Sequence, residues 1–226
     1  MYREPGEDRP FRHPGRRREI PDDTAAILDY LPQGNPFDRH VEHRRTPLAQ
    51  AVGTRYFTLV ELVVPEGEQF DVGEKIYIGP DYIGRGPIKS ITGPIEYTDL
   101  TSVSKSNLPA VLANIIKENE QIFVKIFNIS GPITLRMHSL ELLPGIGKRT
   151  LNIILEERKK APFKSLKELE ERLSLRGVKL HGVESIIASR IIKEMEGGER
   201  YYLFIKPKIY EKDAIYLRLL DAIYSV

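Results

Sequence analysis

Two glycines and two basic residues lie close together in the string Leu143-Pro144-Gly145-Ile146-Gly147-Lys148-Arg149-Thr150. Apolar residues flank the string, so we expect a short helix ending at Leu143 and a second helix beginning near Lys148. Residues without a Cβ let an anion approach the backbone. Amides of a first helical turn are unpaired donors at the positive end of the helix dipole. The pattern predicts a phosphate site formed by Gly145, Ile146, Gly147, Lys148, Arg149 and Thr150.

This string resembles the hairpin of the helix-hairpin-helix family, which implies that backbone amides hold phosphates of DNA or RNA without reading bases. The alternative is a structural corner in which Pro144-Gly145 only ends a helix. A second unit follows, with the capping box Ser165-x-x-Glu168 opening one helix and residues 175–179 leading into another. This second hairpin lacks the proline, so we expect mainly packing, with Arg176 and Lys179 as secondary contacts.

Basic residues gather around these hairpins. Residues 136–179 hold eleven Lys and Arg against six Glu, a local charge of +5. Residues 56–105 hold four basic and eight acidic residues, a local charge of −4. A near-neutral chain with one basic segment fits a polyanion that docks at one place. A solvated helix face would give the same count.

Composition limits the remaining classes of protein. The 226 residues hold no cysteine, which excludes disulfides and thiolate metal sites. No apolar run approaches the ~20 residues of a membrane span, and the start lacks a secretory signal. We therefore expect a cytoplasmic protein without a membrane partner.

Catalytic residues are not arranged for a recognisable reaction. Glycosylases of the helix-hairpin-helix family carry an aspartate downstream of the hairpin, but residues 100–212 contain no Asp. His40 and His43 lie in a basic loop, where a solvated loop is favoured over a metal site. Asp22-Asp23 and Asp29 could hold Mg²⁺ in a nuclease, which stays an alternative. The sequence predicts no enzyme, cofactor or metal.

The first half of the chain has the pattern of a flexible arm followed by a small β domain. Residues 1–20 are rich in Arg, Pro and Gly and predict a flexible basic arm. Residues 21–105 should form an OB-like barrel or bent sheet, giving an α+β fold. Its strands are expected at residues 25–30, 56–64, 75–78, 88–91 and 94–97.

The second half predicts helices and a returning tail. Ser106-Asn107 should cap one long helix with Pro109 in its first turn, ending near Asn128, within a connecting segment of residues 106–133. Residues 134–197 then form the tandem helix-hairpin-helix module. In residues 198–226 we expect a strand at 200–205 and a helix at 214–224, packing back on the β domain.

The chain as a whole resembles an uncharacterised archaeal family of predicted RNA-binding proteins, which joins an OB-like part to helix-hairpin-helix motifs. The resemblance spans residues 25–195 and implies nucleic-acid binding without supplying a reaction. It is carried by Leu28-Asp29-Tyr30-Leu31-Pro32-Gln33-Gly34, Pro47-Leu48-Ala49-Gln50-Ala51-Val52-Gly53, Tyr77-Ile78-Gly79 and Glu141-Leu142-Leu143-Pro144-Gly145-Ile146-Gly147-Lys148.

These patterns favour a non-enzymatic nucleic-acid-binding protein that contacts phosphates largely independently of sequence. The β domain is expected to add a second face with Arg39, Arg44, Arg45 and exposed tyrosines. OB-like surfaces stack bases of single strands, so RNA is mildly favoured over DNA. The alternatives are an adaptor that binds protein partners in a ribosome, transcription or repair assembly, and, less favoured, a metal-dependent nuclease.

Overall fold

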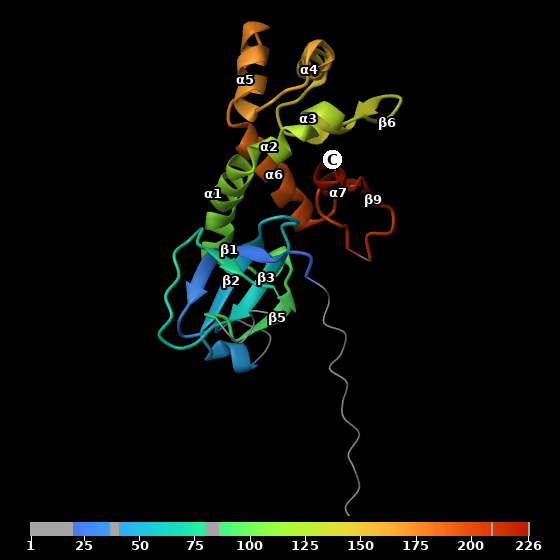
Figure 1. Cartoon of the computed structure of the whole chain (residues 1–226). Coiled ribbons are helices and arrows are strands. Elements are labelled where there is room, and N and C mark those ends of the chain that lie inside the picture. The colour runs from blue at the N-terminus through green and yellow to red at the C-terminus, as the bar shows by residue number, and fades with distance from the viewer. Residues whose placement is uncertain (1–19, 37–40, 80–85, 209, 226) are drawn as a thin grey trace, which may run out of the picture.

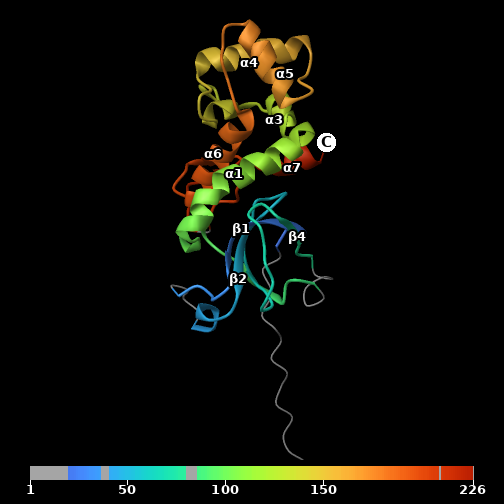
Figure 2. The ribbon, with the colours of Figure 1, turned by 90° about the vertical axis from the view of Figure 1, so that its left-hand side faces the viewer.

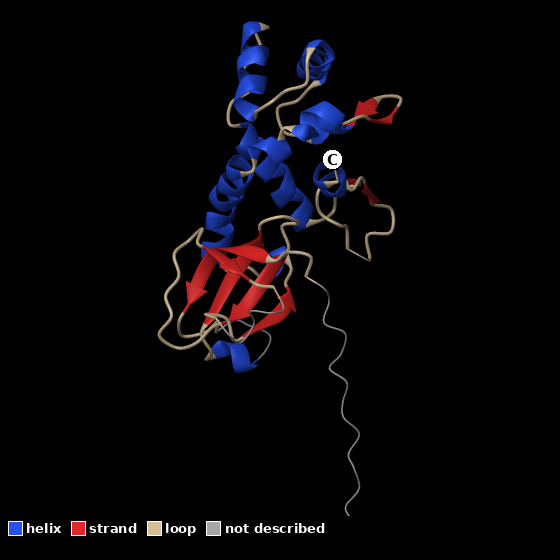
Figure 3. Ribbon diagram, viewed as in Figure 1, coloured by secondary structure: helices blue, strands red, loops and turns tan. Residues whose placement is uncertain are grey.

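The computed structural model describes residues 20–36, 41–79, 86–208 and 210–225. Arg39 and the predicted arm at residues 1–20, apart from Ile20, lie outside these ranges. Strands gather in the lower part of the molecule and most helices lie above them (Figure 3). The predicted combination of a five-stranded sheet with several helices is confirmed.

The sheet is antiparallel, with strand order β4-β1-β2-β3-β5. β4 and β5 are its edges, and no ladder joins them within the described ranges, so the sheet is open there. The strands are β1 (Thr24–Leu31), β2 (Leu48–Gly53), β3 (Leu59–Val63), β4 (Lys75–Tyr77) and β5 (Ser90–Pro94).

Both faces of the sheet are covered by apolar side chains. Successive side chains of a strand point to opposite faces, and in β1 Ala26 and Leu28 join the main core with the helices. Ala25 and Ile27 join a second cluster on the other face. The register shifts beside Ile27 in β1 and beside Glu61 in β3, and such bulges bend a sheet. The sheet therefore holds a small core of its own.

Three sequence predictions for the sheet are wrong. β2 was not expected from the residue pattern, because it is buried along its whole length and shows no polar alternation. β3 starts later than predicted, since the Asp22 carboxylate accepts the amides of Arg55, Tyr56 and Thr58 and holds them in a turn. The two strands expected between residues 88 and 97 are the single strand β5 and a 3-10 helix, η2 (Tyr97–Asp99).

The single connecting helix that we predicted is divided into three, α1 (Ser102–Glu118), α2 (Glu120–Phe123) and α3 (Lys125–Ile129). It also begins earlier, because the Thr101 hydroxyl accepts the Ser104 amide at 2.9 Å, which places Pro109 inside α1. Phe123, Val124, Ile126 and Phe127 are all buried. One straight helix buries one face, so the chain turns at Asn119 and Val124 to bury all four.

A second group of helices follows a small hairpin. α1 runs from the sheet to this group and packs against α6 (Figures 1 and 2). The elements are β6 (Pro132–Thr134), β7 (Met137–His138), η3 (Ser139–Leu142), α4 (Lys148–Lys160), α5 (Leu166–Leu175) and α6 (Val183–Glu196). No helix in the described part of the chain is long and apolar enough to span a membrane.

The C-terminal tail pairs mostly with itself and with α6. The expected strand is reduced to β8 (Tyr201–Tyr202), which pairs in parallel with β9 (Ile215–Tyr216), and the helix is α7 (Leu219–Tyr224). The amides of residues 203–205 donate to the Glu194 carboxylate instead of to a strand. α7 packs on α2 and α3, and Tyr224 reaches Tyr56 beside the sheet, with 5.8 Å between ring centroids.

Candidate functional site

The turn between η3 and α4 comprises residues 143–147 and has the predicted tight geometry. Gly145 has a φ of +81°, a region that favours glycine. The Ile146 amide donates to the Leu143 carbonyl at 3.2 Å and closes the turn. Gly147 is the N-cap of α4, with φ −89° and ψ −178°. Any residue can adopt those angles, so Gly147 is not required by the backbone conformation.

The amides at this turn are open to solvent. Gly145, Gly147, Lys148 and Arg149 are all exposed, and their backbone N–H groups have no acceptor within the described residues. A Cβ added at Gly147 would meet no atom within 4 Å. Four donors without an acceptor among the described residues therefore lie on exposed residues near the positive end of a thirteen-residue helix, which is an arrangement that can bind anions.

Ile146 does not belong with these donors. Its side chain is 3 % exposed and packs in the main core. Its amide is engaged in the turn. Ile146 therefore offers a phosphate no free backbone donor in this structure.

The side chain of Lys148 makes contacts across the turn in addition to carrying a positive charge. Its Nζ lies 2.8 Å from Glu141 Oε1 and donates to the Arg136 carbonyl at 2.7 Å. The hydrogen bond from Lys148 is the largest cause that lowers the pKa of Glu141. Arg149 is exposed and has no acidic partner among the described residues, and Thr150 is half-buried. Arg149 is thus the freer cation.

His138 holds the base of the turn. Its Nδ1 accepts the Leu140 amide at 3.2 Å, and its own amide donates to Glu141 at 2.8 Å. Burial, and then the charge of Arg158, lower the pKa of His138. Because Nδ1 is an acceptor here, the folded chain favours the neutral ring.

His138 should make stability depend on pH. The unfolded chain takes up a proton near pH 6.5 and the folded chain only at lower pH. Its contribution is therefore fully present above about pH 6.5 and is lost as the pH falls toward the folded pKa. His138→Asn keeps a capping acceptor and cannot titrate. We expect the urea midpoint of the wild type to fall relative to this variant between about pH 7 and 5; parallel curves would contradict the assignment.

In the turn between α5 and α6, a carboxylate of the protein accepts the first amide of the following helix. The first amides of α4 have no such acceptor among the described residues. The Glu170 carboxylate accepts the Val183 amide, the first of α6, at 3.1 Å. Gly182, the N-cap, has a φ of +65°. A carboxylate at this place fills the position that a phosphate would take and repels another anion. The prediction that the second hairpin mainly contributes packing agrees with this geometry.

The two secondary contacts predicted there differ in their surroundings. Arg176 lies 2.8 Å from Glu156 and 2.7 Å from Glu157, so it ties the turn to α4. Lys179 is exposed and has no partner among the described residues. Its neighbour Leu180 lies 3.9 Å from a Cβ built on Gly145. Only Lys179 is therefore available beside the first turn.

Within the described ranges, six of the eleven cations in the basic segment are engaged by acids or carbonyl groups and five are not. The acid at its centre is Glu157, whose pKa falls to about 2 through hydrogen bonds from Lys160 and Arg176. Engaged cations are Lys148, Arg158, Lys160, Lys167, Arg172 and Arg176. The other five, whose side chains form no salt bridge in the described ranges, are Arg136, Arg149, Lys159, Lys164 and Lys179, and the charge of Lys164 acts on Glu168.

The molecule therefore combines a sheet, the helix α1 that connects it to the helical group, and two turns. Related proteins are known. Residues 21–206 match the family described as "Protein of unknown function (DUF655)". The chain belongs to this family. Uncharacterized protein MJ0038 of Methanocaldococcus jannaschii is 37% identical over 206 residues, which cover 90% of this chain and 89% of that protein.

A solved relative extends the match to three dimensions. The crystal structure of Af1531 from Archaeoglobus fulgidus has a TM-score of 0.72 and 42% identity, and covers 82% of this chain and 100% of that chain. Both DUF655 relatives are archaeal, so the resemblance to an uncharacterised archaeal family is confirmed. The family match ends at Lys206, and β9 and α7 lie beyond it.

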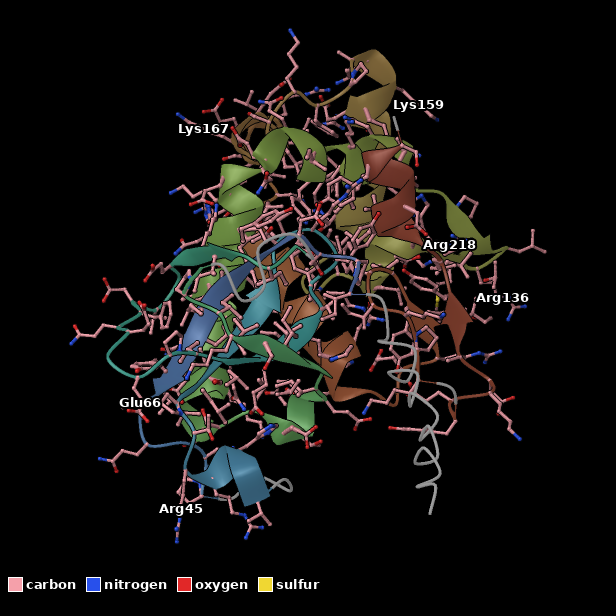
Figure 4. The ribbon with its side chains drawn as sticks, turned by 60° about the horizontal axis from the view of Figure 1, so that its bottom comes forward. Arg45, Glu66, Arg136, Lys159, Lys167 and Arg218 are labelled. Atoms are coloured by element: carbon pink, nitrogen blue, oxygen red, sulfur yellow. The ribbon has the colours of Figure 1, made fainter. Side chains whose placement is uncertain are left out.

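The basic residues predicted on the β domain of this DUF655 protein do not lie beside the turn. Arg44 ends the 3-10 helix η1 (Val41–Arg44), and Arg45 follows it. Arg45 lies at one end of the molecule and Lys159 of α4 at the other (Figure 4). Arg39 lies outside the described residues. The structure therefore does not bring Arg44 and Arg45 together with the turn in one face.

Two of the three acids considered for a metal, Asp22 and Asp29, are engaged in hydrogen bonds. Asp22 accepts three amides, and Asp29 accepts the Thr101 hydroxyl at 2.7 Å. His43 lies 3.1 Å from Glu61. The described part of this DUF655 protein shows no group of three or more His, Asp or Glu that could hold a metal ion.

A cleft of about 1170 Å³ between the sheet and the tail was missed by sequence reasoning, because residues far apart in the chain form it. Tyrosines line it, including Tyr56, Tyr97 and Tyr216. Its lining holds four Lys and Arg against four Asp and Glu, and two of the cations are paired, with Lys208 3.0 Å from Glu96 and Arg218 2.8 Å from Asp221. The cleft therefore lacks the positive charge that a polyanion site needs.

Proposed function

We propose that this DUF655 protein is a non-enzymatic, cytoplasmic nucleic-acid-binding protein that holds phosphates with the η3–α4 turn, in the manner of a helix-hairpin-helix. The observation that carries the proposal is the set of exposed, unbonded amides at the start of α4 beside Arg149. Backbone amides carry no base information, so binding is largely independent of sequence.

The preference for RNA rests on treating the bent sheet as OB-like, since such sheets bind single strands. Among the secondary contacts, we keep Lys179 because its side chain is exposed without a partner in the described ranges and its neighbour Leu180 lies beside Gly145. We do not propose that Arg176 contacts nucleic acid, because Glu156 and Glu157 engage its side chain.

Salt dependence tests the proposal. If the turn engages ~3 phosphates, log affinity plotted against log salt should have a slope of about −2 to −3. Fluorescence anisotropy with labelled RNA and DNA, single- and double-stranded, measures that slope. Binding that ignores salt, or no binding at low salt, would refute the proposal.

The same substrates separate the other functions. Incubation with Mg²⁺ or Mn²⁺ should leave them intact, whereas a nuclease would cleave them. An adaptor would bind neither RNA nor DNA and would keep its protein partners in Arg149→Glu.

A further inference from the structure

The β6–β7 hairpin carries an apolar residue and a cation at its tip. Leu135 is 107% exposed, the highest value among the large apolar side chains of the described residues, and Met137 is 37% exposed. Arg136 between them is exposed and has no acidic partner in the described ranges. The hairpin projects from the helical part of the molecule (Figure 1), and Arg136 points outward at its edge (Figure 4).

Hydrogen bonds hold this tip in one shape. The Thr134 hydroxyl accepts the amides of Arg136 and Met137 at 3.3 and 3.1 Å. At the base, the Ser139 amide and hydroxyl donate to the Gly131 carbonyl at 3.0 and 2.8 Å. Leu135 is therefore presented on an ordered turn, which reduces the entropy lost when it is buried by a ligand.

The tip is also attached to the start of α4. Lys148 Nζ donates to the Arg136 carbonyl and contacts the Glu141 carboxylate. The tip therefore lies within the reach of one lysine side chain from the start of α4, where the amides of Lys148 and Arg149 are found. In a duplex, phosphates border a groove and base edges form its floor, so both features can be engaged at once.

We infer that Leu135 is a wedge that enters between stacked base pairs of a duplex whose phosphates are held by the η3–α4 turn. This inference rests on the proposed function and specifies its ligand as a base-paired segment. Proteins that bind a minor groove combine inserted apolar side chains with arginines, and Leu135 beside Arg136 supplies both. The cations beside the tip that have no acidic partner in the described ranges, Arg136 and Arg149, favour this occupant over an apolar protein surface, because they can pair with phosphates.

The test uses short RNA and DNA duplexes with 2-aminopurine at successive positions, since this base fluoresces when it is unstacked. Wild type should raise the fluorescence at one or more steps. Leu135→Ser, at saturating concentration, should leave the base quenched and should bind about tenfold more weakly through the lost apolar burial. Val72→Ser, which alters an exposed apolar residue (55%) in the β3–β4 loop, is the matched control and should behave as wild type.

Each outcome decides a separate point. Equal fluorescence and affinity in wild type and Leu135→Ser would overturn the wedge while leaving phosphate binding in place. Binding to single strands alone, or duplex binding with no unstacking at any position, would also overturn it. No binding by wild type at low salt would refute the proposed function itself. Circular dichroism checks that Leu135→Ser is folded.

Discussion

Replacing Gly147 by aspartate should make the protein more stable and bind nucleic acid more weakly. Gly147 already has N-cap dihedrals and open space around its Cα, so a carboxylate there can accept the free amides of α4. Better capping and the favourable charge at the helix start together contribute about 0.5–1 kcal/mol. The same carboxylate takes the donors and repels a phosphate, so affinity should fall roughly 10- to 100-fold. Thermal unfolding and anisotropy measure the two effects.

The second turn provides the natural precedent, because Glu170 already caps α6 in this way. Gly147→Asn adds a cap without charge and should give an intermediate loss of affinity. Val72→Asp places the same charge in the distant β3–β4 loop and should leave binding nearly unchanged. If Gly147→Asp binds as tightly as wild type, phosphates are not held by these amides.

Replacing Glu194 by alanine should destabilise the protein by about 3–5 kcal/mol, because it leaves a buried cation and several donors without their partner. Glu194 is 2 % exposed and lies 2.8 Å from Arg190, which is equally buried. It also accepts the amides of residues 203–205 at 2.7–2.9 Å. Burial raises the pKa of Glu194, and these hydrogen bonds oppose that effect.

Urea unfolding measures this loss, and faster hydrogen exchange at residues 203–205 should accompany it. Glu196→Gln alters an exposed acid on the same helix while keeping a group that can hydrogen-bond Tyr97, and it should change stability by no more than about 0.5 kcal/mol. A loss below about 1 kcal/mol in Glu194→Ala would mean that the tail is held mainly by its apolar contacts.

The sequence was most informative where local chemistry determines structure. The turn at Gly145 and Gly147 was predicted at the correct residues, because a positive φ and a helix start have short-range signatures. The capping of α5 by Ser165 was found for the same reason.

Long-range contacts explain most of the errors. Glu194 shortens the predicted strand at residues 200–205 by taking its amides, and Asp22 delays the start of β3. In the site, Lys148 and Arg176 were taken as available cations, but Glu141 engages the first and Glu157 the second. A single sequence shows that a residue is charged, but not which partner the fold places beside it.

One apolar cluster connects Leu28 of β1, Phe57, Leu143 and Leu220 of α7. The sheet and the helices share this one cluster, while a second, smaller cluster lies on the other face of the sheet. A fragment cut between them would expose the apolar surface that the other part now covers. The sheet and the η3–α4 turn therefore keep a constant separation, and a nucleic acid that reached both would have to fit a fixed span.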